Sequence, residues 1–463
     1  MSDGVGNSPV TVKTNNGNYT ILIQAWPMPN SGIAGKTPYI FSSGSVGVGT
    51  GLIIDAASIV ELNISHFLTS PLLTGHLIVN DNKNLFINML NSANTVIGIQ
   101  FVREKSDGIG DSAGNFEDPY QLRHYFIADA IDIIDSSGPN TLLKISLLDM
   151  HAINMMATIS YSTGAVRKSN KDILKTIFNR AFKYAQFDDR GLIEGGIPDF
   201  FCTTENFTVA DSIEYILNRI LTVDAHGLIF TPYDPIKKKF YAWTASDIQK
   251  NQKTGLAPIG YLPNPSNSVK MGNNIYSIRV NNWTSGINMY DTIREYDTST
   301  FNYATNSFTR AKISEDKMVE FLRGEGTKGT AINKGTSFIK SKFEKIPRDP
   351  ALMNTTYLHF SRNWSSSVTD ENLWAKLRKL YTEHGAPVIE VDGTSYMSPG
   401  TQYTILGGEG KEQVTTAHGL LGSWIITKVD YSIKNGQFRC FFTLNRSERI
   451  SNISEYLDFT NPI

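Results

Sequence analysis

The pair Asn435-Gly436 constrains the fold most, because it is the preferred centre of a type I′ turn and predicts a two-residue β-hairpin. Lys434 then faces Gln437 across the turn. Apolar and polar residues alternate on both sides, so this register gathers the apolar pairs on one face. The predicted pairs are Ile433 with Phe438, Tyr431 with Cys440, Val429 with Phe442, and Thr427 with Leu444. We therefore expect a buried hairpin face with Cys440 in the core.

The same period of two predicts a series of strands over residues 46–150. Val60, Leu62 and Ile64 alternate with polar residues. Further strand-like stretches cover residues 76–79, 96–102, 125–134 and 141–148, with a Gly/Asp-rich loop at 106–118. This region is therefore predicted to be a β region. Residues 1–45 are rich in Gly, Ser, Asn and Pro, which predicts an N-terminal arm made of loops.

The period changes to that of a helix in the middle of the chain. Ser169 with Asp172, and Thr208 with Asp211, have the spacing of helix capping boxes. Each is followed by an apolar stripe at helical spacing. The stripes are Ile173, Leu174, Ile177, Phe178, Ala181 and Phe182 in the first helix, and Ile213, Ile216, Leu217 and Ile220 in the second. A predicted hairpin of residues 227–230 and 240–243 completes a compact α/β domain over 165–260.

The remaining sequence predicts further strands that are interrupted by an insertion. Tyr276, Ile278 and Val280 restart the strand pattern within residues 268–300, residues 386–450 are strongly β, and 451–463 are read as a C-terminal tail. The insertion at 301–385 is predicted to contain helices near 314–323 and from Thr369 to Gly385. A faint repeat aligns residues 127–143 with 425–441. It indicates either two copies of one barrel or a chance likeness of two hairpins.

Charge and cysteine content exclude several classes of protein. Lys and Arg number 43 and Asp and Glu 44, a formal charge of −1, which argues against a DNA-wrapping or polybasic membrane protein. Only 19% of residues are charged, below the roughly 25% of ordinary domains, as in chains that bury surface in an assembly. Cys202 and Cys440 form no zinc or disulfide pattern. We expect folding in a reducing cytoplasm, with no secretion signal and no membrane span.

No motif predicts catalysis or cofactor binding. The glycines at 47–51 are followed by strand-like sequence rather than by the helix that a dinucleotide site needs, and Gly410-Lys411 lacks the rest of a phosphate loop. The acidic loop holding Asp107, Asp111, Glu117 and Asp118 misses the calcium-loop spacing, so we expect a solvated hairpin tip, with ion binding as the alternative.

Two further groups of residues were considered for chemistry. Asp188, Asp189 and Glu194 follow a helix and are interpreted as its polar exit; a carboxylate pair for glycoside hydrolysis is the alternative. The histidines form no HxH or HExxH motif, although metal binding by scattered residues remains open. They lie at positions 66, 76, 124, 151, 226, 359, 384 and 418. We therefore predict no catalytic, cofactor-binding or metal-binding residue, and expect His66 and His76 to be packed or hydrogen-bonded in strands.

The order of these segments resembles phage tail baseplate central hub proteins, found in contractile-tail phages and related injection machines. The likeness covers most of residues 46–450, and the order of the motifs carries it. The segments are the strand at 59–64, the run 70–81 with Ser70-Pro71 and Gly75, the helices at 169–187 and 208–221, the strands at 227–230 and 240–243, and the ending with Gly393, Pro399-Gly400, residues 422–426 and 444–446.

Membership of that family would imply a β-rich α+β fold with two similar antiparallel barrels, at residues 46–150 and at 268–300 plus 386–450, together with an α/β middle domain and a partly helical insertion. It would imply a homotrimer whose six barrels join the sixfold tail tube to the threefold central spike around a DNA channel. Tube, spike, other baseplate proteins and the tape measure protein would be its partners, in a virion assembled in the host cytoplasm, with no enzymatic activity. The alternatives are a tail-associated peptidoglycan or glycan hydrolase and a receptor-binding tail protein.

Overall fold

The fold below is that of a computed structural model of the chain. The residues that it describes are 10–14, 17–27, 52–54, 56–81, 95–103, 121–136, 141–158, 170–182, 186–188, 207–217, 229–235, 239–244, 259–261, 275–280, 296–302, 307–313, 355–361, 387–394, 397–406 and 422–445. No helix among these residues is long and apolar enough to cross a membrane.

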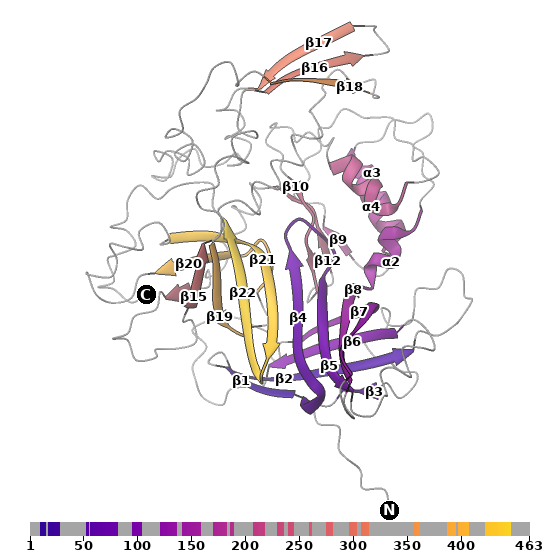
Figure 1. Cartoon of the computed structure of the whole chain (residues 1–463). Helices are drawn as coiled ribbons and strands as arrows, with labels where there is room; N and C mark the ends of the chain where they lie inside the picture. Colours follow the sequence, from indigo (N-terminus) through magenta and orange to yellow (C-terminus); the bar gives the residue numbers. More distant parts are fainter. Residues whose placement is uncertain are drawn as a thin grey trace, which may run out of the picture.

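One large, mostly antiparallel sheet dominates the fold (Figure 1). Its main strand order is β1-β2-β6-β7-β8-β5-β4-β21-β22-β19-β15. The bounds are β1 Val10–Thr14, β2 Gly17–Pro27, β4 Ile59–Phe67, β5 Thr74–Asp81, β6 Thr95–Arg103, β7 Gln121–Asp135, β8 Thr141–Asp149, β15 Ile275–Val280, β19 Pro387–Asp392, β21 Gly422–Lys434 and β22 Gln437–Asn445. The five strands predicted between residues 60 and 148 are confirmed.

Short strands extend this sheet. β3 (Leu52–Ile53), which is followed by a 3-10 turn at Ala56–Ser58, pairs with β2. β20 (Gln402–Leu406) pairs with β21, and β14 (Ile259–Tyr261) lies parallel to β20. The two strand sets predicted as separate barrels therefore belong to one continuous sheet, in which β4 pairs directly with β21. Their description as two similar barrels stays a prediction.

The expectation of loops at the N-terminus is wrong for residues 10–27. β1 and β2 pair with each other, and β2 pairs along its length with β6. Val12, Tyr19, Ile21 and Ile23 in these strands are buried. These apolar residues alternate as in a strand, but the Gly and Asn residues around them led to the prediction of loops. Burial against the sheet thus outweighs the local preference for turns.

The terminal hairpin has the predicted register near its turn. Lys434 faces Gln437, and the three apolar pairs nearest the turn are confirmed. Asn435 and Gly436 have φ values of 51° and 71°, as a type I′ turn requires. Further along, Ile426 faces Leu444, because the register shifts between Ile426 and Lys428 and skips Thr427, whose hydroxyl donates to the carbonyl of Thr443 at 3.2 Å. The predicted pair of Thr427 with Leu444 is wrong because of this bulge.

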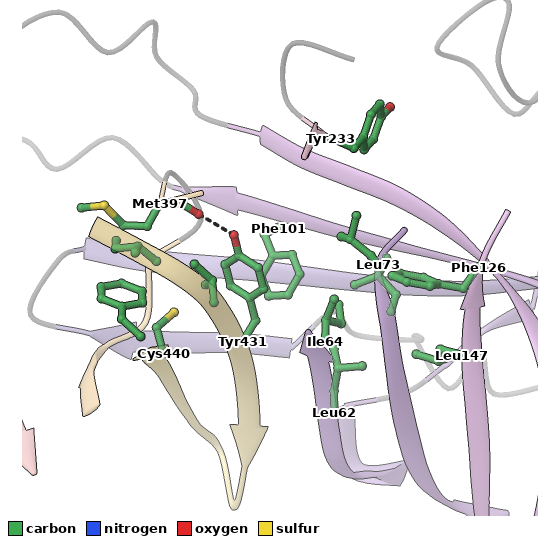
Figure 2. Close-up of a cluster of buried hydrophobic side chains, with 14 of the residues drawn as sticks. Leu62, Ile64, Leu73, Phe101, Phe126, Leu147, Tyr233, Met397, Tyr431 and Cys440 are labelled. Atoms are coloured by element: carbon green, nitrogen blue, oxygen red, sulfur yellow. Dashed lines mark hydrogen bonds between the residues drawn. The ribbon is translucent and has the colours of Figure 1, made fainter. Parts of the chain in front are cut away.

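The sheet curls so that strands far apart in its order share one core. The ring of Phe101 on β6 stacks on that of Phe438 on β22, with centroids 5.3 Å apart. Figure 2 shows Leu62, Ile64, Phe101 and Tyr431 pointing into this common interior. The Tyr431 hydroxyl donates a hydrogen bond of 2.7 Å to the carbonyl of Met397, which satisfies its one polar group in the core.

Cys440 belongs to this core, as predicted. It is fully buried, and its sulfur exchanges hydrogen bonds of 3.3 Å with the backbone of Thr394. Burial raises the pKa of the Cys440 thiol to about 12. The thiol is therefore protonated at neutral pH and acts as a packed side chain. Cys202 lies outside the described residues.

Within the described residues, three helices lie together beyond the end of β8 (Figure 1). They are α2 (His151–Met156), α3 (Asn170–Ala181) and α4 (Val209–Leu217). The predicted stripe of α3 is confirmed, since Ile173, Leu174, Ile177 and Phe178 are buried. The Asp211 carboxylate accepts the backbone N–H and the hydroxyl of Thr208, and the Thr208 hydroxyl accepts the Asp211 N–H, so the second capping box is confirmed. Ser169 and Ile220 lie outside the described residues.

Small sheets accompany the helices and the insertion. β10 (Ile229–Phe230) pairs with β13 (Trp243–Thr244), and β11 (Tyr233–Asp234) pairs with β12 (Lys239–Tyr241). The hairpin predicted from residues 227–230 and 240–243 is therefore found only where Phe230 faces Trp243, because Phe240 pairs instead with Tyr233. β9 (Gln186–Asp188) joins β12 in parallel. A separate sheet contains β16 (Tyr296–Asn302), β17 (Ser307–Ile313) and β18 (Thr355–Ser361). Its strands were not predicted, and the helices predicted within 301–385 lie outside the described residues.

Candidate assembly edge and buried histidine cluster

A row of side chains crosses the sheet where β4 ends and β5 begins. The register pairs Ser65 on β4 with Thr74 on β5, Thr74 with Leu148 on β8, and Asp149 with Phe126 on β7. His66, Leu73 and Asp149 come one residue further along, where the Asp149 N–H donates to the Leu73 carbonyl at 3.1 Å. Residues directly opposite one another in antiparallel strands point to the same face, and so do residues two apart in one strand. His124, two residues before Phe126, therefore reaches the same face as Asp149.

Asp149 is the centre of a buried polar cluster. Its Oδ1 atom lies 2.8 Å from both the backbone N and the Nδ1 of His151. Its Oδ2 atom lies 3.0 Å from the backbone N of Leu73 and 2.8 Å from Nε2 of His124. Each carboxylate oxygen thus has one backbone donor and one imidazole partner. The bond to the His151 N–H also satisfies a donor at the start of α2, where Met150 supplies no side-chain cap.

The cluster keeps Asp149 ionised in the interior. Burial by itself would raise the pKa of this carboxyl, but attraction to His124 and His151 and their hydrogen bonds outweigh burial and hold the pKa well below its usual range. A buried carboxylate requires such partners, because an unpaired buried charge is strongly unfavourable. The two histidines are therefore integral to the fold of this region.

His66 is a second buried polar group beside the cluster. It is fully buried, and neither ring nitrogen has a partner in hydrogen-bond geometry among the described residues, although the Tyr233 backbone is close enough to favour its charged form. Burial lowers the pKa of His66 to about 3, and the charges of nearby His124 and Asp149 also act on it. The ring is thus neutral at pH 7. A buried polar group without a partner is unusual and requires an explanation.

Aromatic rings from the middle of the chain enclose the two histidines. The ring centroid of His151 lies 4.8 Å from that of Tyr233, 5.3 Å from that of Phe240 and 5.5 Å from that of Phe182. His124 lies 5.9 Å from Tyr233. The cluster therefore joins the large sheet to the helical part and is shut off from solvent. It offers no exposed nucleophile to a large substrate.

The same three groups have the composition of a metal site. His124 Nε2, a carboxylate oxygen of Asp149 and His151 Nδ1 all lie within 4.8 Å of one another. Imidazole nitrogen and carboxylate oxygen are ligands that Zn²⁺ accepts. Two backbone N–H groups already orient the carboxylate, as outer-shell donors do in metal centres.

A second feature lies at the surface, in the C-terminal half of β7. Its N-terminal half, through Ile127, pairs with β6, whereas from Ala128 onward β8 is its only partner among the described residues, so within them its other edge pairs with no strand. Ile131, Ile133 and Ile134 in this half are 38, 61 and 50% exposed. We call residues 129–135 the β7 edge. An open apolar edge of this kind is a template for pairing with another chain.

The residues considered for chemistry from the sequence do not form a common site among the described residues. Asp188 ends β9, where its carbonyl accepts the backbone N–H of Ala242 at 3.1 Å. His76 is hydrogen-bonded in a strand, as expected, with Nε2 3.2 Å from Glu61 Oε1. Asp189, Glu194, the acidic loop, the glycines at 47–51 and Gly410-Lys411 lie outside the described residues.

The sequence did not single out His124, Asp149 and His151. The signal that could have found them is the run Asp149-Met150-His151 at the point where a predicted strand ends. An Asp followed two residues later by a His suits a helix start. The partner His124 lies in the preceding strand, and only the pairing of β7 with β8 brings it to Asp149.

No protein-family model and no curated protein matches the chain. Among solved structures, it is similar to a tail protein from Neisseria meningitidis, with 9% identity, a TM-score of 0.49, and coverage of 92% of this chain and 96% of that one. A 43 kDa tail protein of prophage MuSo2 from Shewanella oneidensis has 11% identity, a TM-score of 0.46, and coverage of 92% and 98%. A PdpA–VgrG complex of Francisella has 12% identity, a TM-score of 0.43, and coverage of 97% and 61%.

Proposed function

We propose that the chain is a structural hub protein of a phage tail baseplate, which assembles as a homotrimer and has no catalytic activity. The order of the sequence motifs over residues 46–450 supports this proposal. So does a fold in which two strand sets from distant parts of the chain share one curled sheet through β4 and β21. One continuous β-sheet that joins both ends of the chain suits a structural protein that forms a ring.

The β7 edge is the observation that carries the proposal of assembly. Three isoleucines are exposed on a strand whose outer edge has no described partner. Soluble monomers protect such edges with charge, proline or a covering segment, because open edges promote association. Asp132 lies between Ile131 and Ile133, and Asp129 and Asp135 flank the isoleucines on either side, where their charges limit unspecific association. A second copy of the chain would cover the isoleucines in a specific interface.

Three copies would match the hub role. A trimer with two barrels in each chain presents six similar units to the sixfold tail tube and threefold symmetry to the central spike. Tube, spike, other baseplate proteins and the tape measure protein are the proposed partners, and the tail of the virion is the proposed location. With a net charge of −1, the chain would not hold DNA that passes through its channel.

The test is the mass and symmetry of the assembled protein. Light scattering of the purified chain should give three times 51.4 kDa, and electron microscopy should show the large sheets of three copies around one axis. A monomer, an even-numbered ring, or a trimer without a common channel would overturn the hub proposal.

The proposed absence of catalysis has its own test. The purified chain should not hydrolyse peptidoglycan or glycans. Turnover that disappears in Asp188→Ala or Glu194→Ala would overturn this part of the proposal and favour the hydrolase alternative.

A further inference from the structure

We propose that His124, Asp149 and His151 bind a single divalent transition-metal ion, of the Zn²⁺ class, that ties the large sheet to the helical part of the chain. This inference does not depend on the tail role. It also departs from the expectation, based on sequence, that no residue binds a metal.

The arrangement of donors around Asp149 supports a cation between the two rings. Each carboxylate oxygen keeps one backbone N–H, from Leu73 or His151, whether or not a metal is bound. The other contact of each oxygen is to an imidazole nitrogen, at 2.8 Å in both cases. One cation can replace the two imidazole protons at these contacts. The backbone donors then remain as the outer shell that fixes the carboxylate.

The type of ligand selects the class of metal. Two imidazole nitrogens with one carboxylate oxygen suit Zn²⁺ and its neighbours among the transition metals, whereas Ca²⁺ and Mg²⁺ prefer all-oxygen sites. The three residues are at most 6% exposed, so a bound ion would be shielded from bulk solvent. Rotamers there are held by packing, notably by the rings of Tyr233 and Phe240 against His151.

His66 supplies the second, independent observation. It is fully buried beside the cluster, and neither ring nitrogen meets the geometry of a hydrogen bond within the described residues, although the Tyr233 backbone lies close to the ring. With three protein ligands, a tetrahedral ion has a fourth position for water. A metal-bound water would give His66 the partner that it lacks. An ion at this site therefore accounts both for the convergence of the three ligands and for the unpartnered ring.

The chain itself explains why the site would be structural. His124 lies on β7, Asp149 ends β8, and His151 begins α2. A shared ion would hold the end of β8 and the start of α2 together beneath the rings of Tyr233 and Phe240. Metal binding of this kind adds directly to folding free energy, because the unfolded chain does not present the three ligands together.

The experiment measures metal in the full chain without a histidine tag. Protein that is expressed with Zn²⁺ in the medium and then dialysed should contain about one zinc ion per chain. Inductively coupled plasma mass spectrometry measures this content. Zn²⁺ should raise the thermal midpoint of chelator-treated protein. His124→Gln and His151→Gln should each weaken zinc binding by about 100-fold or more, because each removes one of three ligands. His76→Gln is the matched control, since it alters another histidine–carboxylate pair and should leave zinc binding unchanged.

X-ray absorption on the wild-type protein keeps the proposal testable if the variants fail to fold. The spectrum should show zinc coordinated by two imidazole nitrogens, with oxygen atoms as the remaining ligands. A shell containing sulfur, an all-oxygen shell, or wild-type protein with no more zinc than His124→Gln would overturn the proposal. The last result would show that the cluster is a hydrogen-bonded network alone.

Discussion

The ring of Tyr19 on β2 meets the ring of Phe438 on β22 edge-on, with centroids 5.3 Å apart and planes at 78°. The two residues come from opposite ends of the chain and from strands that are not neighbours in the sheet. Their contact is possible because the sheet curls until its two ends face each other. Gly393 completes this contact, since its N–H donates to the carbonyl of Phe438 at 3.0 Å and its α-carbon lies against the ring.

The first prediction concerns Gly393. A methyl group on this residue would overlap the ring of Phe438, which is fixed by Tyr19 and Phe101. Gly393→Ala should therefore lower the free energy of unfolding by about 1–3 kcal/mol, as overpacked cores do. Chemical denaturation measures the change. Adding Phe438→Leu should make the double variant less destabilised than the sum of the single changes, and strict additivity would show that the ring is not the obstacle.

The second prediction compares the two faces of the terminal hairpin. Phe442 is fully buried between Val429 and Ile389, so Phe442→Ala should destabilise the protein by about 3–5 kcal/mol. Arg439, on the other face, binds Asp392 at 2.9 Å and lies 3.7 Å over the ring of Tyr276. Its replacement by Ala should cost about 1–2 kcal/mol, since a hydrogen-bonded charge is lost at a half-buried position. Equal costs in denaturation curves would contradict this packing.

The third prediction concerns pH. Unfolded His66 binds a proton with a pKa near 6.5, whereas in the folded protein its pKa is about 3. The unfolded state therefore binds more protons below pH 6.5, and stability is lost as the pH falls. Between pH 7 and pH 5 the loss from this one group should be about 2 kcal/mol.

His66→Leu provides the comparison for the pH experiment. Unfolding of chelator-treated wild type and variant should be followed at several pH values between 7 and 5. The variant should lose less stability than the wild type over this range. Parallel curves would mean that His66 is protonated in the folded state or is not buried.

The fourth prediction concerns the β7 edge. Ile133→Glu with Ile134→Glu should leave the fold of one chain nearly unchanged, because exposed substitutions usually shift stability by about 0.5 kcal/mol or less. It should abolish the trimer, because charges would be buried in the interface. Met156→Glu is the control, since Met156 is 64% exposed on α2, away from this edge. Light scattering would contradict the assignment if the double variant stays trimeric.

Local patterns in the sequence determined the elements whose formation depends on near neighbours. The turn pair Asn435-Gly436 and the alternation beside it defined the hairpin register as far as Val429, because turn geometry and side-chain period act over a few residues. The stripe of α3 and the cap of Thr208 with Asp211 followed for the same reason. The burial of Cys440 was likewise predictable from its place opposite Tyr431.

Tertiary structure alone decided the features that depend on distant partners. The bulge at Thr427 and the strands at residues 10–27 arise from pairing across the whole sheet, which no local period records. The same holds for His124, Asp149 and His151, whose two strands and helix meet only through the register of β7 and β8. The sequence supplies these residues singly, whereas a buried carboxylate needs them together, and only the folded chain brings them within hydrogen-bond distance.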